Sequence, residues 1–276
     1  EQCDHLVLQS PVVSNSEWYA LKHYLGDKAV EIDCSFPASS GPDGMRNSLD
    51  RIRAEAEQAV RGGCEHVMLT DRAASKNHVP LPMILATGAV HSHLVRHQLR
   101  TFASVNVASG ECLDVHHFAV LIGVGATTVN AYAAEWTIAE RLEKGLLKGL
   151  NHVQAVANYR KSIEDGLLKI MSKMGISVIA SYRGGYNFEA LGLSRALVAE
   201  FFPPMSSRIS GLGLNGIQSR LMSLHKTAYL DNLSYLPVGG LFRYRKTGER
   251  HAFDGQTIHA MQHACESGSY ASWKKY

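Results

Sequence analysis

The sequence lacks long apolar runs and closely spaced cysteines. Every apolar stretch is soon interrupted by glycine, histidine or a charged residue, so neither a membrane span nor a signal peptide is predicted. The five cysteines are never closer than 30 positions, which excludes a CxxC-type zinc or iron–sulfur ligand run. Their odd number favours a reduced compartment over a secreted disulfide scaffold. We therefore expect a cytoplasmic protein without a membrane partner.

The sequence also lacks an excess of charge of one sign. Its 28 lysines and arginines and 25 aspartates and glutamates give a net charge of +3, and no lysine/arginine run exceeds two residues. This excludes the basic stripe of a nucleic-acid-binding protein. A GxSxG nucleophile elbow and a P-loop are absent too. The chain of 276 residues is long enough for one large domain, and because it begins at Glu1 without a methionine, we expect a piece of a longer protein.

Short apolar strands alternate with amphipathic helices over most of the sequence before Pro203. A capping box of Ser14 and Glu17 starts the first helix, and Asp43 and Asp114 are placed to cap two later ones. The predicted strands are 29–34, 66–70, 101–107, 127–130 and 176–181. The predicted helices include 17–24, 45–60, 84–97, 115–122, 152–174 and 188–202. This alternation is typical of a parallel α/β fold, and we expect an incomplete, barrel-like parallel β/α core over residues 1–202.

Residues 203–276 are expected to form a C-terminal extension, with helices over 217–229 and 256–266 and a small hairpin over 237–251 around Thr247 and Gly248. Within it, residues 211–216 match GxGxxG. A dinucleotide site needs an apolar strand directly before such a motif, and residues 204–210 would make a poor buried strand. A glycine-rich loop is the favoured interpretation. The alternative that stays open is a free-standing flavin- or nucleotide-binding barrel-like oxidoreductase.

Histidines cluster at His91, His93 and His97, and His116 and His117 add a second pair. Imidazoles four residues apart on a helix can share a metal ion, which raises the alternative of a metal-dependent hydrolase. Such a site also needs a third ligand, and Glu111 and Asp114 are the only acids nearby in the sequence. We favour structural histidines and predict no metal site.

Six segments resemble the signature of the glutamate synthase large subunit. They are 115–123, 158–161, 166–177, 181–184, 188–193 and 207–214. The resemblance extends over essentially the whole chain, and it is to the central domain of that subunit, nearest to the bacterial NADPH-dependent type.

The resemblance implies a place in a four-part subunit. In that family an N-terminal glutamine amidotransferase is followed by the central domain, an FMN-binding barrel and a β-helix domain. The whole enzyme releases ammonia from L-glutamine, carries it through a tunnel, and condenses it with 2-oxoglutarate at the flavin to give L-glutamate. It implies FMN and a 3Fe–4S cluster in the whole subunit, and a small NADPH/FAD subunit as partner.

Several catalytic parts of that family are missing from this sequence. The family's glutaminase nucleophile is an N-terminal cysteine, whereas residue 1 is Glu and Cys3 is not terminal. The closely spaced cysteines of the cluster and the FMN-barrel sequence are absent too. We therefore expect no catalytic residue and no cofactor bound by this chain alone. Its expected role is a scaffold that links the amidotransferase and FMN domains and lines part of the ammonia tunnel.

The carboxyl ends of parallel strands mark where a functional surface should lie. From the predicted strands, the residues expected to face the tunnel or a neighbouring domain are Met45, Arg46, Thr70, Asp71, Arg72, Asn130, Ser181, Tyr182 and Arg183. Thr70 suits the wall of an ammonia path, and Arg72 or Arg183 suits a carboxylate of a neighbouring domain or of the substrate. The competing interpretation is that these loops satisfy their own backbone groups.

Overall fold

The computed structural model describes residues 6–230, 238–240 and 243–276. The chain divides into two compact units, residues 1–226 and residues 227–276, and each is described by itself. The domain boundary expected at residue 202 stays a prediction. In the described part of the chain, no helix has both the length and the apolar character that crossing a bilayer requires.

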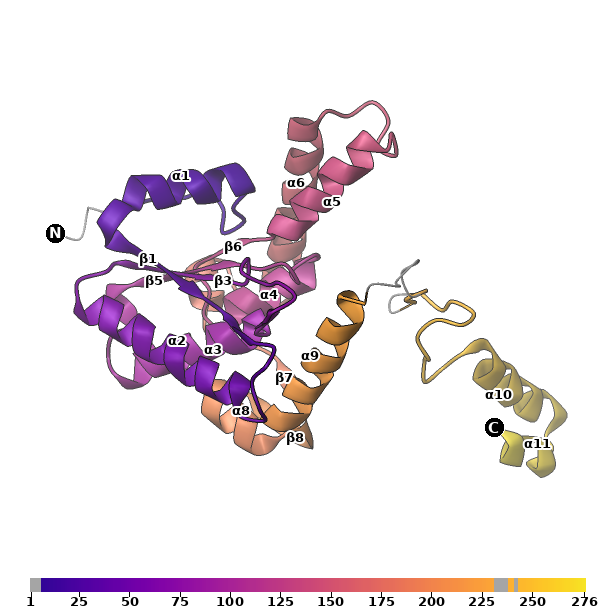
Figure 1. Ribbon diagram of the computed structural model, residues 1–276. Coiled ribbons are helices and arrows are strands. Elements are labelled where there is room, and N and C mark those ends of the chain that lie inside the picture. Colours follow the sequence, from indigo (N-terminus) through magenta and orange to yellow (C-terminus); the bar gives the residue numbers. More distant parts are fainter. Residues whose placement is uncertain (1–5, 231–237, 241–242) are drawn as a thin grey trace. The chain divides into compact units, whose positions relative to one another are not determined.

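Helices and strands alternate through the first unit (Figure 1). The strands are β1 (Ala29–Asp33), β2 (Ser35–Pro37), β3 (His66–Thr70), β4 (His78–Pro80), β5 (Ser104–Ala108), β6 (Thr128–Asn130), β7 (Glu189–Leu193) and β8 (Ser206–Leu212). The helices are α1 (Asn15–Leu25), α2 (Gly44–Arg61), α3 (Met83–Arg96), α4 (Val115–Gly123), α5 (Tyr132–Glu143), α6 (His152–Lys173), α7 (Ile179–Tyr182), α8 (Arg195–Phe201) and α9 (Leu214–Ala228).

Four strands form one parallel sheet in the order β1-β3-β5-β6. Each strand of this sheet lies beside the strand of the same sheet that follows it along the chain, and a helix connects the two members of each pair, as in a β/α barrel. Within the described residues the sheet stays open, and β7 and β8 pair with each other in a separate parallel sheet. The predicted α/β class and incomplete, barrel-like parallel core are confirmed.

The main sheet is buried on both faces. Val67, Leu69 and Val107 belong to the large core that includes α2 and α3, which lie side by side on one face (Figure 1). Met68 points to the other face, where Trp18 of α1 covers it and is only 1% exposed. Burial on both faces is the usual state of a parallel sheet, and it explains the continuous apolar run Val67–Leu69 in the central strand β3.

Local sequence signals explain where most helices begin and end. Ser14 and Glu17 form the predicted capping box, and Asp114 accepts hydrogen bonds from two amides at the start of α4. Asp43 occupies the first position before α2, but its side chain accepts no capping hydrogen bond, so this part of the prediction is wrong. Gly175 follows α6 with a φ of +70°, which fits the predicted helix stop.

Two predicted elements near the end of the first unit are wrong. Residues 176–181 form no strand; bends lead instead into the short helix α7. The helix expected over 188–202 is divided into β7 and α8, with Gly192 at a φ of +78° that a helix does not allow. The apolar residues of the second segment reach the core, because Ala190 and Phe201 are buried, whereas residues 176–181 are exposed or half-buried.

The second unit holds α10 (Gly255–Ser267) and α11 (Tyr270–Lys275). Asp254 caps α10, and Gly268 ends it in the left-handed conformation, in agreement with the predicted last helix. The predicted hairpin over 237–251 lies partly outside the described residues. Its described part contains a turn in which the Gly248 amide donates to the Arg245 carbonyl, but no strand.

Candidate functional site

The carboxyl ends of the four parallel strands form one row. Asp33 pairs with Thr70, Thr70 with Ala108, and Ala108 with Asn130. The residues that follow these strands therefore meet along a single edge, which we call the carboxyl edge. Ligands of open parallel sheets bind at this edge in general, so the predicted site can be tested residue by residue.

Asp71, which directly follows β3, holds the end of β5. Both of its carboxylate oxygens lie 3.0 Å from the amide nitrogen of Gly110. Burial raises the pKa of Asp71, while hydrogen bonds from the Gly110 amide and the Tyr132 hydroxyl act in the opposite direction. A Cβ atom at position 110 would lie 2.7 Å from the Tyr132 hydroxyl oxygen. Glycine is therefore required for the close approach of these two chain segments.

Arg72 organises the other half of the carboxyl edge. Its Nη2 donates to Asn130 Oδ1 at 2.8 Å and to Asn15 Oδ1 at 3.2 Å. The guanidinium lies 4.2 Å from the centre of the Tyr132 ring, with Tyr19 and Trp136 farther out. Its Nε is buried without a hydrogen-bond partner. Among the described residues, no carboxylate forms an ion pair with Arg72.

Thr70 and Asn130 are buried beneath these contacts. The Thr70 hydroxyl accepts a hydrogen bond from the Arg72 amide at 3.2 Å, and the Asn130 amide group donates to the Val13 carbonyl at 2.9 Å. The exposed fractions of the two residues are 5% and 0%. The structure thus brings together four predicted site residues, Thr70, Asp71, Arg72 and Asn130, and joins them through their own hydrogen bonds.

Met45 and Arg46 have other roles. Both lie in the first turn of α2, where Met45 is fully buried in the core and its amide donates to Gln218 Oε1 of α9 at 3.0 Å. Arg46 donates two hydrogen bonds to Glu200 of α8. Burial opposes ionisation of Glu200, but Arg46 and Arg53 together hold its pKa below the usual range. Arg46 is thus already paired with a carboxylate of its own chain.

Ser181, Tyr182 and Arg183 lie at the opposite edge of the sheet. Their predicted place at the carboxyl edge depends on a strand over 176–181, and that strand is absent from the structure. The loop after Tyr182 instead packs on the end of α4, where the Gly184 amide donates to the Ile122 carbonyl at 3.1 Å. Tyr182 itself is 1% exposed. The placement of these three residues at the carboxyl edge is therefore wrong, whereas a tunnel-facing or interdomain role for them stays a prediction.

The three histidines of the metal alternative do not form one group. The Nδ1 atom of His91 accepts a hydrogen bond from Arg100 Nε at 3.0 Å. Burial lowers the pKa of His91 to about 4, and the charges of Arg100 and Arg183 add to this shift, so the ring is neutral at pH 7. His93 and His97 lie apart from it and meet Glu57 of α2 instead.

The GxGxxG segment is not the glycine-rich loop that was expected. It comprises the end of β8 and the start of α9, but β8 is mostly exposed and pairs only with β7. A Cβ atom at position 211 would lie 2.2 Å from the Gly192 carbonyl oxygen. The close approach of β7 and β8 therefore accounts for Gly211 without a nucleotide.

The thiols near the carboxyl edge are not activated. Cys34 and Cys112 are buried, and burial raises the pKa of both thiols above the ordinary value. A nucleophilic cysteine needs the opposite shift. The free cysteines of the described chain, Cys34, Cys64, Cys112 and Cys265, are also absent from its one group of possible metal ligands.

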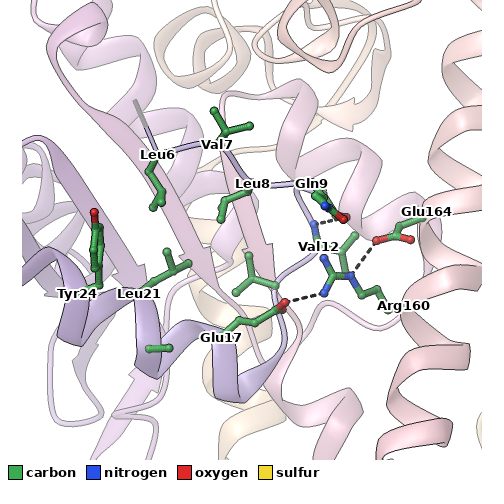
Figure 2. Close-up of a pocket in the computed structure, with 13 residues that line it drawn as sticks. Leu6, Val7, Leu8, Gln9, Val12, Glu17, Leu21, Tyr24, Arg160 and Glu164 are labelled. Carbon is green, nitrogen blue, oxygen red and sulfur yellow. Dashed lines mark hydrogen bonds and ion pairs between the residues drawn. The ribbon is translucent and has the colours of Figure 1, made fainter. Parts of the chain in front are cut away.

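A pocket of about 660 Å³ lies between residues 6–13, α1 and α6 (Figure 2). Leu6, Leu21 and Tyr24 line one side. Arg160 lies on the other side and bridges Glu17 and Glu164 at 2.7 and 2.8 Å. The wall formed by residues 6–8 is an apolar run, of which Val7 is 85% exposed.

The family model and the relatives found by sequence agree with each other. A family model described as the glutamate synthase central domain matches residues 1–194. The large chain of glutamate synthase [NADPH] from Azospirillum brasilense is 58% identical over 98% of this chain, and that from Bacillus subtilis is 39% identical over 98%. This chain spans 18% of the length of each.

Similarity to solved structures is weaker. A DHODH from Eimeria tenella, in complex with ferulenol, is 13% identical and has a TM-score of 0.37, with 56% of this chain and 37% of that chain covered. A mutant flavocytochrome b2 is 14% identical, with a TM-score of 0.39 and coverage of 61% and 49%. At these scores the similarity does not define a common fold.

Proposed function

This chain belongs to the glutamate synthase central domain family, and on that premise we propose that it is the non-catalytic middle part of a glutamate synthase large chain. In the whole enzyme it links the amidotransferase domain to the FMN-binding domain. The enzyme makes L-glutamate from L-glutamine and 2-oxoglutarate, with electrons that reach the large chain from a small NADPH/FAD subunit in the cytoplasm. The coverage of the relatives supports this, because 82% of their length lies outside the matched segment.

The carboxyl edge carries this proposal. In an enzyme built on a parallel sheet, this edge offers open, unpaired groups to a substrate. Here Asp71 is engaged by Gly110, and Arg72 by Asn130 and Asn15. Groups that already satisfy one another favour a structural edge against which a neighbouring domain packs.

The two cofactors of the whole enzyme belong to other parts of it. A 3Fe–4S cluster needs three thiolates at one place, and the group of possible metal ligands in the described chain contains no cysteine. A phosphate-binding loop needs open space beside its glycines, and the Gly192 carbonyl oxygen occupies the space beside Gly211. The residues present do not fit either group.

The charge of Arg72 supports a proposed role for the carboxyl edge in guiding ammonia. Arg72 is half-buried and forms no ion pair within the described chain, although the carboxylates of Asp71 and Glu135 attract its charge from a longer distance. A fixed cation disfavours ammonium beside it but not neutral ammonia. We propose that this edge forms part of the tunnel wall, with Arg72 as its charged member and the buried Thr70 and Asn130 as support.

A flavin and activity measurement on the purified chain tests the non-catalytic role. FMN fluorescence is followed during titration with the chain, and glutamine hydrolysis and NADPH oxidation are assayed on the same sample. We expect no saturable quenching and no turnover above the buffer rate. Stoichiometric FMN binding, or turnover at an enzyme-like rate, would instead favour the free-standing oxidoreductase.

A further inference from the structure

Two helices bring three possible metal ligands together on the outer surface of the first unit. His93 and His97 lie four residues apart on one face at the end of α3, and Glu57 lies on the neighbouring α2. One ligand atom from each side chain lies within 4.8 Å of the other two, and Oε2 of Glu57 lies 2.6 Å from His93 Nε2 and 3.9 Å from His97 Nε2. The side chains of Glu57 and His93 are about one-fifth exposed and that of His97 is 40% exposed.

Neighbouring groups orient the ligand atoms. The His97 Nδ1 lies 2.9 Å from the His93 carbonyl oxygen and donates to it, which leaves the Nε2 lone pair free to point toward Glu57. Arg61 binds the Oε1 atom of Glu57 at 2.8 Å, so Oε2 remains for a ligand role. Polar partners of this kind are the usual outer shell of a metal site.

We propose that Glu57, His93 and His97 bind a divalent transition-metal ion such as Zn²⁺ and thereby clip α2 to α3. Two imidazoles and one carboxylate suit Zn²⁺ and its neighbours in the first transition row rather than Mg²⁺ or Ca²⁺. Three protein ligands leave a fourth position, and the partial exposure of the group lets water occupy it.

The distances require only small side-chain movements. Ligand atoms about 2.0–2.1 Å from a tetrahedral Zn²⁺ lie roughly 3.3 Å from one another. The Glu57–His93 distance of 2.6 Å must open, and the Glu57–His97 distance of 3.9 Å must close, each by about half an ångström or slightly more. The ion takes the place of the hydrogen that Glu57 and His93 now share.

The local charges act in both directions. The carboxylate of Glu57 attracts the ion. Arg61 and Arg53 also place positive charge beside the ion. The site should therefore bind Zn²⁺ more weakly than a structural zinc site with four protein ligands. The ion binds only the folded chain, because Glu57 is far from the two histidines in sequence.

Isothermal titration of the 276-residue chain with ZnCl₂ tests the proposal. The chain is stripped with a chelator, carries no affinity tag, and contains Cys265→Ser, so that the exposed thiol does not compete. We expect one saturable Zn²⁺ site per chain and a rise in melting temperature with Zn²⁺ concentration. His97→Ala and Glu57→Gln should each weaken binding at least about tenfold.

The control is His116→Ala, which removes an exposed histidine of α4 and should leave Zn²⁺ binding unchanged. Melting curves without metal establish that each variant is folded. An X-ray absorption spectrum of the bound Zn²⁺ should show nitrogen and oxygen neighbours only. Weak, non-saturable binding, or an affinity that His97→Ala does not change, would overturn the proposal and leave Glu57 and His93 as a hydrogen-bonded pair.

Discussion

Asp71 and Gly110 join two neighbouring strands of the sheet at their carboxyl ends, through a main-chain amide that lies 3.0 Å from both carboxylate oxygens. The contact connects the loop after β3 to the loop after β5. It lies at the place where a substrate would sit in a barrel enzyme. In this chain a carboxylate at that place binds the protein's own backbone.

Replacement of Asp71 by alanine should destabilise the chain. The variant leaves the half-buried Gly110 amide without its acceptor, which costs about 1–3 kcal/mol. Urea unfolding at pH 7 measures the change. Asp165→Ala is the matched control, because it removes an exposed carboxylate paired with Lys161 and should change stability by less than about 0.5 kcal/mol. Equal effects of the two variants would contradict the structural role of Asp71.

Two glycine variants test whether the glycine at position 211 is needed for strand packing or for nucleotide binding. Gly211→Ala forces a Cβ atom against the Gly192 carbonyl and should cost about 1–3 kcal/mol of stability. Gly213→Ala is the control, because its Cβ atom would meet only Ser194 Oγ, at 3.6 Å, and should be nearly neutral. Thermal unfolding compares the two. Similar stabilities would contradict the packing explanation, and loss of flavin binding in either variant would restore the oxidoreductase alternative.

The sequence predicted the first half of the fold well because its signals there are local. The capping box of Ser14 and Glu17 and the apolar face of α2 are visible within a few residues. Strand 176–181 failed for a different reason. Its apolar residues satisfy strand propensity, but no neighbouring strand is available to them, and propensity alone does not decide pairing.

The site was predictable only where it follows from topology. Thr70, Asp71, Arg72 and Asn130 come together because parallel strands end at the same edge. Gly110 and Tyr132 follow β5 and β6 and carried the same signal, which was missed. Glu57 had no such signal. It contacts His93 because two helices pack together, and the spacing of residues along the sequence does not predict that contact.

His91 should make the chain sensitive to acid. Its pKa is lowered to about 4, by burial first, whereas a histidine of the unfolded chain titrates near 6.5. The folded state therefore binds fewer protons between these values, so the stability present above pH 6.5 is lost as the pH falls toward 4. The loss should be about 2–3 kcal/mol.

Urea unfolding of the wild type and His91→Gln at pH 7 and pH 5 measures this effect. The variant should be less stable at pH 7, since Arg100 loses a buried acceptor, but its stability should fall less between the two pH values. His116→Gln, which changes an exposed ring, serves as control and should retain the full slope. An unchanged slope in His91→Gln would assign the acid sensitivity to other groups.

Arg72→Met should uncouple ammonia release from glutamate synthesis in a full-length large chain that carries this segment. Methionine keeps the contact with the Tyr132 ring but removes the charge that disfavours ammonium at the carboxyl edge. The free ammonia that accumulates during turnover on glutamine should rise relative to the glutamate formed. Lys161→Met, which removes an exposed charge from α6, should leave the ratio unchanged. If Arg72→Met folds and also leaves that ratio unchanged, the carboxyl edge supports the enzyme without lining the path of ammonia.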